Sequence, residues 1–496
     1  MQINFQTNKM RSLTCCVNRV MTQEQTQEVR LPESMPDIAR VLGVWGKPVI
    51  RGKEWQNGSM SVAGGVMTWV MYAQEEDGNP QILETWIPFQ MKWELPETRY
   101  DGYIFAVPAL KSIDARSTNP RKLMVRANLS VWGRGIVPEE TEVYTIGSVP
   151  DDVQVLDWEY PMDLALESGE IQLHVEEAVD MAGFHPVPET ILRHDFQPTV
   201  TEQRIMASRL VMRGKGNLHL VYLADGKVYN RDVEVDFSQF TDLDGEFSQA
   251  ATAQIIPVIT NAECDGQDGV IHIRCDMVAQ YMIFDRVMVP LTEDAYSNER
   301  AISLENSQLR MDRMLERKIQ PVHLEHKINV ETEKIADISC LLDFPYRTNT
   351  DGSSLVIPGQ IALLYYDRNG NLQAITNRFE HRLPWDMEES VTLGALVSLT
   401  EPPRGVSGGS QVDCSWNMAV ETTAFVKDGQ WMVTGMELGE VNRKEEPVPS
   451  LILQRYADQR LWDTAKACGS TVDAILRANG LEEAPEVGKM ILIPVS

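Results

Sequence analysis

The chain has 496 residues, of which 45 are basic and 72 acidic, and a net charge of −27 repels nucleic-acid phosphates and anionic lipid headgroups. A hydrophobic content of 43% is enough to bury several cores, so the length predicts about three or four domains rather than a disordered chain. These numbers disfavour nucleic-acid binding and membrane-surface binding as functions.

Cysteine usage and the amino terminus indicate the compartment. Seven cysteines, with one adjacent pair at Cys15 and Cys16, form no recognisable disulfide framework and suit a reducing cytosol. Residues 1–28 are polar and lack the continuous apolar core of a secretory signal, and no stretch is apolar for long enough to cross a bilayer. We therefore expect a cytoplasmic protein that stays where it is made.

Short alternating segments of Val, Ile, Met, Trp and Tyr dominate the chain before residue 451, separated by Asn-Gly, Asp-Gly and Gly-Asn turns. This pattern predicts mainly β structure, and it repeats weakly with a period on the order of 145 residues. The turn at 57–59 precedes Tyr72 by the same distance that the turn at 351–353 precedes Tyr366, and a middle copy lies at 218–222.

Three copies in series predict three tandem β-sandwich-like domains, which we place at residues 1–165, 166–315 and 316–440. An Arg-Lys-Glu-Glu-Pro-Val-Pro stretch follows the third copy. Residues 441–450 are therefore expected to be an exposed, semi-stiff linker to a tail at residues 451–496.

The tail has the pattern strand, helix, helix, strand. Apolar residues recur at helical spacing from Leu461, whereas Met490 to Ile493 is a short apolar run that suits a buried strand. Thr471 is placed to cap the second helix, and Gly469 and Gly480 are placed to end the first and second helices. We expect most of the burial in this small unit to come from Trp462, Ile475, Leu476 and Ile491.

In element order and in the residue class at each position, this tail resembles a LysM module, which implies a small βααβ fold. Glycan-binding members of that family use a groove between two loops. The resemblance places these loops, and hence the candidate residues for binding a partner or a glycan, at Asp458, Gln459, Arg460, Asn479, Gly480 and Leu481.

The first of these loops departs from the family, which usually has Gly-Asp-Thr before the Leu-Trp pair. Here the loop reads Asp458, Gln459 and Arg460. This change disfavours a sugar, because the small set that lets a sugar amide approach the backbone is missing, and Arg460 can instead act as a fork-shaped donor to a carboxylate of a protein. The alternative is that these are merely solvated loops. The tail holds five basic and six acidic residues, so 26 of the 27 net negative charges lie before it and the tail is the part least likely to repel an acidic partner.

Residues 31–50 carry a second resemblance. They read Leu-Pro-Glu-Ser-Met-Pro-Asp-Ile-Ala-Arg-Val-Leu-Gly and end in Gly-Lys-Pro-Val-Ile, which resembles the opening of the SpoVID/SipL-associated repeat of spore-coat morphogenesis proteins. Tandem copies followed by one LysM module is also the arrangement of those proteins. The resemblance is strong in the first copy and weak in the second and third, which lack the Pro-Asp-Ile-Ala-Arg signature.

The family resemblance implies a non-enzymatic scaffold of the spore envelope, located in the mother cell at the forespore surface. Its LysM-like tail would dock the coat-basement ATPase or another spore-coat protein. The alternative is that the LysM groove binds peptidoglycan or its lipid-linked precursor, with the β domains serving as a stalk. Neither function needs a cofactor, a metal or membrane insertion.

Several short patterns could indicate an enzyme or a metal site, but each has a structural explanation. The stretch 405–409 matches a nucleophile-elbow pattern, yet its surroundings predict a hairpin loop. His323 and His326 lie three apart in a predicted strand, where they point to opposite faces. Cys264 and Cys275 flank one loop out of register and are expected to be buried thiols.

Two further groups of residues have competing explanations. Trp69, Trp86 and Trp93 could form a sugar platform, but we expect them to pack between sheets, because aromatic side chains supply much of a sandwich core. Asp232, Glu234 and Asp236 alternate with valines, which predicts a solvated strand face rather than catalytic carboxylates.

Overall fold

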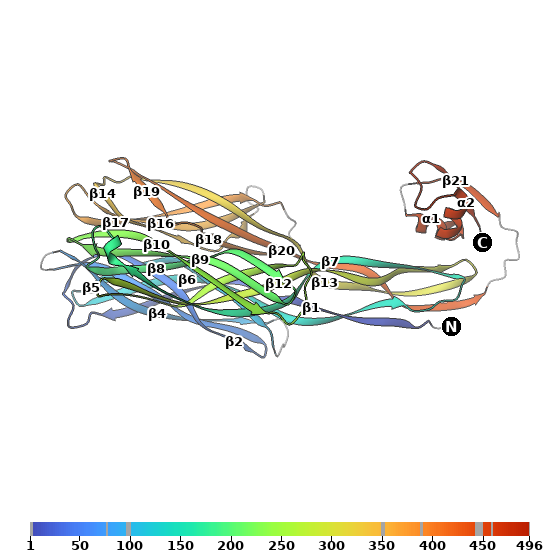
Figure 1. The fold of residues 1–496 in the computed structure, drawn as a ribbon, viewed down its shortest axis with the longest axis horizontal. Coiled ribbons are helices and arrows are strands. Elements are labelled where there is room, and N and C mark those ends of the chain that lie inside the picture. Colours follow the sequence, from blue (N-terminus) through green and yellow to red (C-terminus); the bar gives the residue numbers. More distant parts are fainter. Residues whose placement is uncertain are drawn as a thin grey trace.

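The structure is a computed structural model that describes residues 3–75, 78–95, 101–348, 353–386, 390–441, 450–457 and 460–495. The molecule is elongated, with three lobes at one end and a narrow stem of long strands at the other (Figure 1). Strands make up 76% of the chain, in several antiparallel sheets, and the two helices are short and near the carboxyl terminus. The expectation of a mainly β protein is confirmed.

Three successive groups of strands build the lobes and the stem. The first group contains β1 (Phe5–Arg30), β2 (Ile38–Gln56), β3 (Ser59–Gln74), β4 (Pro80–Glu94), β5 (Tyr103–Asn119) and β6 (Lys122–Ile146). The second contains β7 (Val153–Asp180), the 3₁₀ turn η1 (Met181–Gly183), β8 (Thr190–Met206), β9 (Arg209–Ala224), β10 (Lys227–Asp242), β11 (Thr252–Gln267) and β12 (Val270–Ser297). The third contains β13 (Arg300–Ile328), β14 (Lys334–Leu342), β15 (Tyr346–Thr348), β16 (Ser354–Tyr366), β17 (Leu372–Pro384), β18 (Thr392–Leu399), β19 (Arg404–Ser407) and β20 (Val412–Val441).

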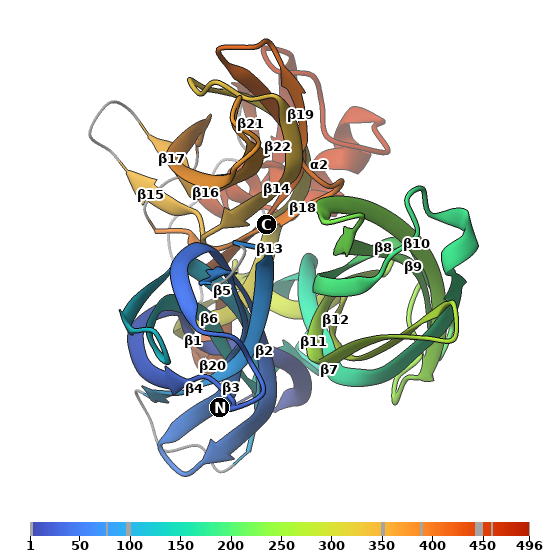
Figure 2. The ribbon, with the colours of Figure 1, turned by 90° about the vertical axis from the view of Figure 1, so that its left-hand side faces the viewer.

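The same order of strand pairing occurs in all three groups. The first long strand pairs with the last, as β1 with β6, β7 with β12 and β13 with β20. A separate antiparallel sheet forms between them, with β3, β9 and β16 as its central strands. The next strand, β5, β11 or β18, pairs again with the last long strand. Figure 2 shows the resulting three lobes around the long axis of the molecule.

The predicted domain boundaries fall inside continuous strands, 165/166 within β7 and 315/316 within β13. The turns between the strand groups lie at 147–152 and 298–299. Of the expected linker, residues 442–449 lie outside the described part of the chain, as do residues 351 and 352 of the third-copy turn. The division into three domains stays a prediction.

Three two-stranded ribbons form the stem. Pairing with β5, β11 and β18 ends at Ile136, Phe284 and Phe425, and beyond these residues each pair of long strands continues alone. A two-stranded ribbon is marginally stable in water, so the three ribbons bury apolar residues against one another. These include Val143, Met162, Leu164, Val289, Leu291, Leu309, Met311 and Met432.

Each central strand carries a glycine opposite a phenylalanine of the following strand. The pairs are Gly64 with Phe89, Gly214 with Phe237, and Gly359 with Phe379. Each glycine stands five residues after the start of its strand. A Cβ atom added at these glycines would lie 2.9, 2.2 and 2.3 Å from the ring, so the ring occupies the space that a side chain would need. Such pairs are a known device for fixing strand register.

Several salt bridges tie the lobes together where they meet. Arg193 of β8 and Asp337 of β14 are 2.8 Å apart and almost fully buried, which joins the second and third lobes. Lys47 of β2 and Asp195 of β8 are also 2.8 Å apart, which joins the first and second. His219 of β9 lies between carboxylates, 2.7 Å from Asp337 and 2.6 Å from Asp232.

Burial and neighbouring charges act in opposite directions on this network. Burial acts to lower the pKa of His219, but the attraction of Asp337 and hydrogen bonds to Asp232 and Asp337 outweigh it and raise the pKa to about 9. Burial acts to raise the pKa of Asp337, but the attraction of Arg193 and His219 lowers it to about 2. Both groups are therefore charged at neutral pH.

The tryptophan and cysteine expectations are confirmed in their main points. Trp69 and Trp93 are 3% exposed, and Trp86 is partly buried against the core of the second lobe. All seven cysteines are free, and burial raises the pKa of Cys264 and Cys275 to about 12.

The histidine, serine and acidic patterns also lie on strands or turns. His323 and His326 both lie on β13, at positions that point to opposite faces of a strand. Ser407 ends β19, which forms a hairpin with β20 and is not followed by a helix. Asp232, Glu234 and Asp236 are exposed as expected, although Asp232 also pairs with His219.

We predict that Gly214→Ala destabilises the protein by about 1–3 kcal/mol, because the new methyl group would overlap the ring of Phe237 and the carbonyl oxygen of Thr199. Thermal unfolding followed by fluorescence measures the effect. Gly52→Ala is the matched control, since its methyl group meets no atom within 4 Å. The double variant with Phe237→Leu should recover part of the loss, and an unchanged unfolding midpoint for Gly214→Ala would contradict the packing role.

We also predict that stability falls with rising pH because of His219. A histidine whose pKa rises on folding contributes its full stability below its unfolded pKa of about 6.5 and loses it as pH rises towards the folded pKa. The unfolding midpoint should therefore decrease between about pH 6.5 and 9. His219→Gln should flatten this decrease, whereas the exposed His323→Gln should keep it. Equal slopes in the two variants would rule out the role of His219.

Candidate functional site

The tail has the four elements expected from its sequence, β21 (Leu451–Arg455), α1 (Leu461–Cys468), α2 (Val472–Asn479) and β22 (Met490–Pro494). The two strands pair antiparallel. The Thr471 hydroxyl accepts a hydrogen bond from the Ala474 amide and caps α2, while Gly469 and Gly480 end the helices with φ of 67° and 63°. These expectations are confirmed.

The core of the tail is shared with the stem. Trp462, Ile475 and Ile491 are buried as expected, and Leu476 packs against them. Tyr296 of β12 belongs to the same cluster, with its ring 4.8 Å from that of Trp462 in an edge-to-face arrangement. The Tyr296 hydroxyl donates a hydrogen bond to the Ser470 carbonyl oxygen at 2.9 Å. The tail is thus packed onto the far end of the stem (Figure 1).

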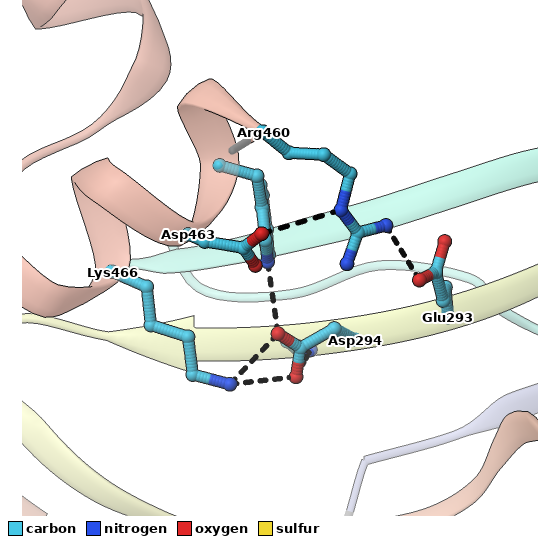
Figure 3. A network of polar contacts seen from close by, with 7 residues as sticks. Glu293, Asp294, Arg460, Asp463 and Lys466 are labelled. Atoms are coloured by element: carbon cyan, nitrogen blue, oxygen red, sulfur yellow. Dashed lines mark hydrogen bonds and ion pairs between the residues drawn. The ribbon is translucent and has the colours of Figure 1, made fainter. Parts of the chain in front are cut away.

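A polar network surrounds this aromatic contact and connects α1 with β12 (Figure 3). The Arg460 guanidinium donates to Glu293 at 2.6 Å and also contacts Asp463. Asp294 accepts from the Trp462 indole N–H at 2.8 Å and from the Lys466 ammonium at 2.7 and 2.8 Å. Two basic side chains of the tail, Arg460 and Lys466, therefore meet two adjacent carboxylates of the stem.

Exposure separates the stronger contacts from the weaker ones. The Arg460 and Lys466 side chains are 54% and 42% exposed, so their ion pairs are screened and each contributes at most about 1 kcal/mol. The Trp462 and Tyr296 rings are 8% and 6% exposed. The buried aromatic pair and the indole hydrogen bond therefore supply most of the contact energy. Burial and the nearby Asp294 raise the pKa of Tyr296 to about 12, so its hydroxyl stays a donor.

The predicted site residues have different positions in the tail. Arg460 faces the stem, and its contacts with Glu293 and Asp463 raise its pKa. The Asn479 amide donates to the carbonyl oxygens of Ile475 and Leu492 and accepts from the Leu492 amide, which holds α2 against β22. Gly480 ends α2, and the Leu481 amide donates to the Leu476 carbonyl oxygen. Asp458 and Gln459 lie outside the described residues.

The sequence interpretation did not include Glu293, Asp294, Tyr296, Trp462 or Lys466 as contact residues. The difference in net charge between the tail and the rest of the chain is the one feature of the sequence that could have pointed to these contacts. The tail is nearly neutral whereas the rest of the chain is strongly acidic, and the carboxylate that Arg460 was expected to contact lies in the same chain. The tail and stem residues that meet are 166 or more positions apart in sequence, so no local pattern marks them.

We predict that Asp294→Asn increases the fraction of molecules whose tail has left the stem by about tenfold, because the charge-assisted bond to Lys466 is lost and the bond to Trp462 is weakened. Hydroxyl-radical footprinting of Tyr296 measures this, since the tail covers its ring. Asp473→Asn, at an exposed pair on α2, is the matched control. Unchanged labelling of Tyr296 in Asp294→Asn would show that Asp294 does not hold the tail.

No helix among the described residues is long and apolar enough to span a membrane. Within the same residues, no group of three His, Cys, Asp or Glu side chains is placed to hold a metal ion.

Comparison with known proteins gives one match. Residues 188–266 match the family described as SipL, SPOCS domain. No curated protein and no solved structure matches the chain. The matched segment contains β8, β9, β10 and nearly all of β11. It lies in the second strand group, where the sequence resemblance is weaker than at residues 31–50. The chain thus contains a SipL SPOCS domain at residues 188–266.

Proposed function

We propose that this protein is a non-enzymatic scaffold of the spore envelope. The observation that carries the proposal is the SPOCS domain, whose family is associated with non-enzymatic coat morphogenesis. A spore-coat assembly role also suits the elongated shape, because a lobed body and a narrow stem place different parts of the chain far apart in space (Figure 1). The protein would act in the mother cell at the forespore surface.

The first and third strand groups are proposed to be further copies of the SPOCS-associated repeat, each a β-sandwich-like domain. Two features support this. The order of strand pairing is the same in all three groups. The glycine and phenylalanine pair also recurs at the same position of each central strand. On this proposal the copies meet at 147–152 and 298–299 rather than at 165 and 315, since the pairing order restarts there.

The tail is proposed to be a LysM-like module that docks a coat protein, such as the coat-basement ATPase. Helix α1 contacts the stem, whereas the outer face of the tail sheet is exposed. Leu451, Leu453 and Met490 are 50%, 63% and 50% exposed on the neighbouring strands β21 and β22. Apolar side chains that remain exposed on a two-stranded sheet are suited to contact a protein surface.

We predict that the full-length protein binds the coat-basement ATPase of the same organism and that Leu453→Asp weakens this binding by about tenfold or more, because a charge replaces an apolar contact. Leu481→Asp tests the predicted groove loop in the same way. A pull-down with the purified ATPase, and separately with insoluble peptidoglycan, measures both ligands. Ile319→Asp, at an exposed apolar residue of β13, is the matched control.

Three outcomes would count against the docking proposal. Binding of the ATPase that is insensitive to Leu453→Asp and Leu481→Asp would move the docking site away from the tail. Retention on peptidoglycan that Arg460→Ala or Leu481→Asp abolishes would favour the glycan function instead. A wild-type protein that binds neither ligand would leave the lobes as the docking surface.

A further inference from the structure

A cavity of about 180 Å³ lies where the three lobes meet. The second lobe supplies one wall from β8 and β9. The first lobe contributes Trp45 and Trp69, and the third contributes β14, Gln360, Thr376 and the segment 399–403. The cavity is distant in the fold from the tail and its contacts, so nothing in the docking proposal depends on it.

The wall from the second lobe is the polar face of a sheet. Side chains of a strand alternate between its two faces, and every second residue of β8 from Arg193 to Thr201 lines the cavity. The same holds for β9 from Lys215 to His219. The intervening residues, such as Phe196 and Leu218, are buried in the apolar core of the lobe. A face of this composition normally meets solvent, but here it meets the other two lobes.

Exposure changes along this wall. Thr201 and Lys215 are exposed, Gln197 and Asn217 are partly buried, and Arg193 is 4% exposed. The cavity therefore extends from the surface inward along β8, and its deep end is formed by Arg193 and His219. The Nε of Arg193 has no hydrogen-bond partner within the described residues.

The charged side chains that line the cavity each have a partner of opposite charge, including Glu401, which is 4.0 Å from Arg404. Arg193 pairs with Asp337, Lys215 with Glu234 at 2.6 Å, and Asp195 with Lys47. His219 lies between two carboxylates. Each cation thus already has a carboxylate partner, so an ionic ligand would have to displace an existing pair.

By contrast, four neutral polar side chains of the cavity are available to form hydrogen bonds with a ligand. The side chains of Asn217, Ser339, Gln360 and Thr376 line the cavity, and none of them makes a hydrogen bond to another described residue. Asn217 lies on β9, whereas Ser339, Gln360 and Thr376 lie on one face of the β14, β16 and β17 sheet, so these groups approach the space from two opposing walls. Amide and hydroxyl groups arranged in this way suit a ligand with several hydroxyl groups, while the partly buried Trp45 offers apolar surface.

The volume limits the size of the ligand. A cavity of about 150 Å³ holds one benzene ring, so about 180 Å³ has room for one six-membered ring, and this cavity also opens to solvent at its Thr201 end. One hexose has a ring of this size. We propose that the cavity between the three lobes binds an uncharged polyhydroxy ligand of the size of a single hexose.

Saturation-transfer NMR and calorimetry on the full-length protein test the proposal. The probes are glucose, galactose and myo-inositol, with glucosamine and glucose 6-phosphate as charged comparisons. We expect at least one uncharged probe to bind in the millimolar range or more tightly. Asn217→Leu should weaken this binding by about tenfold, because it removes hydrogen-bonding groups while keeping a similar side-chain volume. Gln360→Leu, on the opposite wall, provides a second variant if the first does not fold.

Gln203→Leu is the matched control, since Gln203 is exposed on β8 beyond the cavity and should leave binding within about twofold. Thermal unfolding checks that each variant is folded. The proposal is overturned if no uncharged probe binds at about 50 mM, or if a charged comparison binds more tightly than all uncharged probes. Equal effects of Asn217→Leu and Gln203→Leu on binding would also overturn it. The tail variants should not affect this binding, which separates it from the docking function.

Discussion

The packing of the second lobe against the third depends on the buried ion network of Arg193, His219 and Asp337. A buried charge is costly unless its partners are all in place, and removing one partner leaves the others unpaired. Arg193 and His219 belong to the second lobe, whereas Asp337 belongs to the third. The network is therefore complete only when the two lobes are packed together. The charge state of these residues thus depends on the packing of the two lobes. The fixed positions of the ion pairs also give that packing a defined geometry.

The long strands make the lobes and the stem one continuous structure. Strands β7, β12, β13 and β20 each begin or end in a lobe and continue into the stem without interruption. The backbone hydrogen bonds of the β7–β12 and β13–β20 ladders therefore continue from the lobes into the stem. A lobe cannot rotate freely about the stem, because rotation would break the ladder at Phe284 or Phe425 where the additional strand ends.

The sequence predicts those parts of the fold that depend on nearby residues. The caps at Thr471, Gly469 and Gly480 act within one helical turn, so they could be read directly. Alternating valines, as at Val233 and Val235, likewise indicate a strand with one buried face. Mainly β structure and the order of the tail elements followed from such local signals.

The stem and the tail contact could not be read in this way. Leu164 of the long strand β7 shares a core with residues of all three ribbons, and Val289, Leu309 and Met432 among them lie more than 100 positions away. The pairing of Arg460 with Glu293 and of Lys466 with Asp294 depends on where the tail is placed, and no spacing in the sequence encodes that. The cavity between the lobes depends on the same long-range packing.

The direction of the long strands has a mechanical consequence. Strand β20 leads out of the third lobe, runs along the stem beside β13 and is the last strand before the tail. The hydrogen bonds between antiparallel strands are perpendicular to the strands. A pulling force between the lobes and the carboxyl end therefore loads the whole β13 to β20 ladder in shear, and many bonds must break together instead of one after another. Such a ladder resists load far better than a hairpin that is pulled open from its ends.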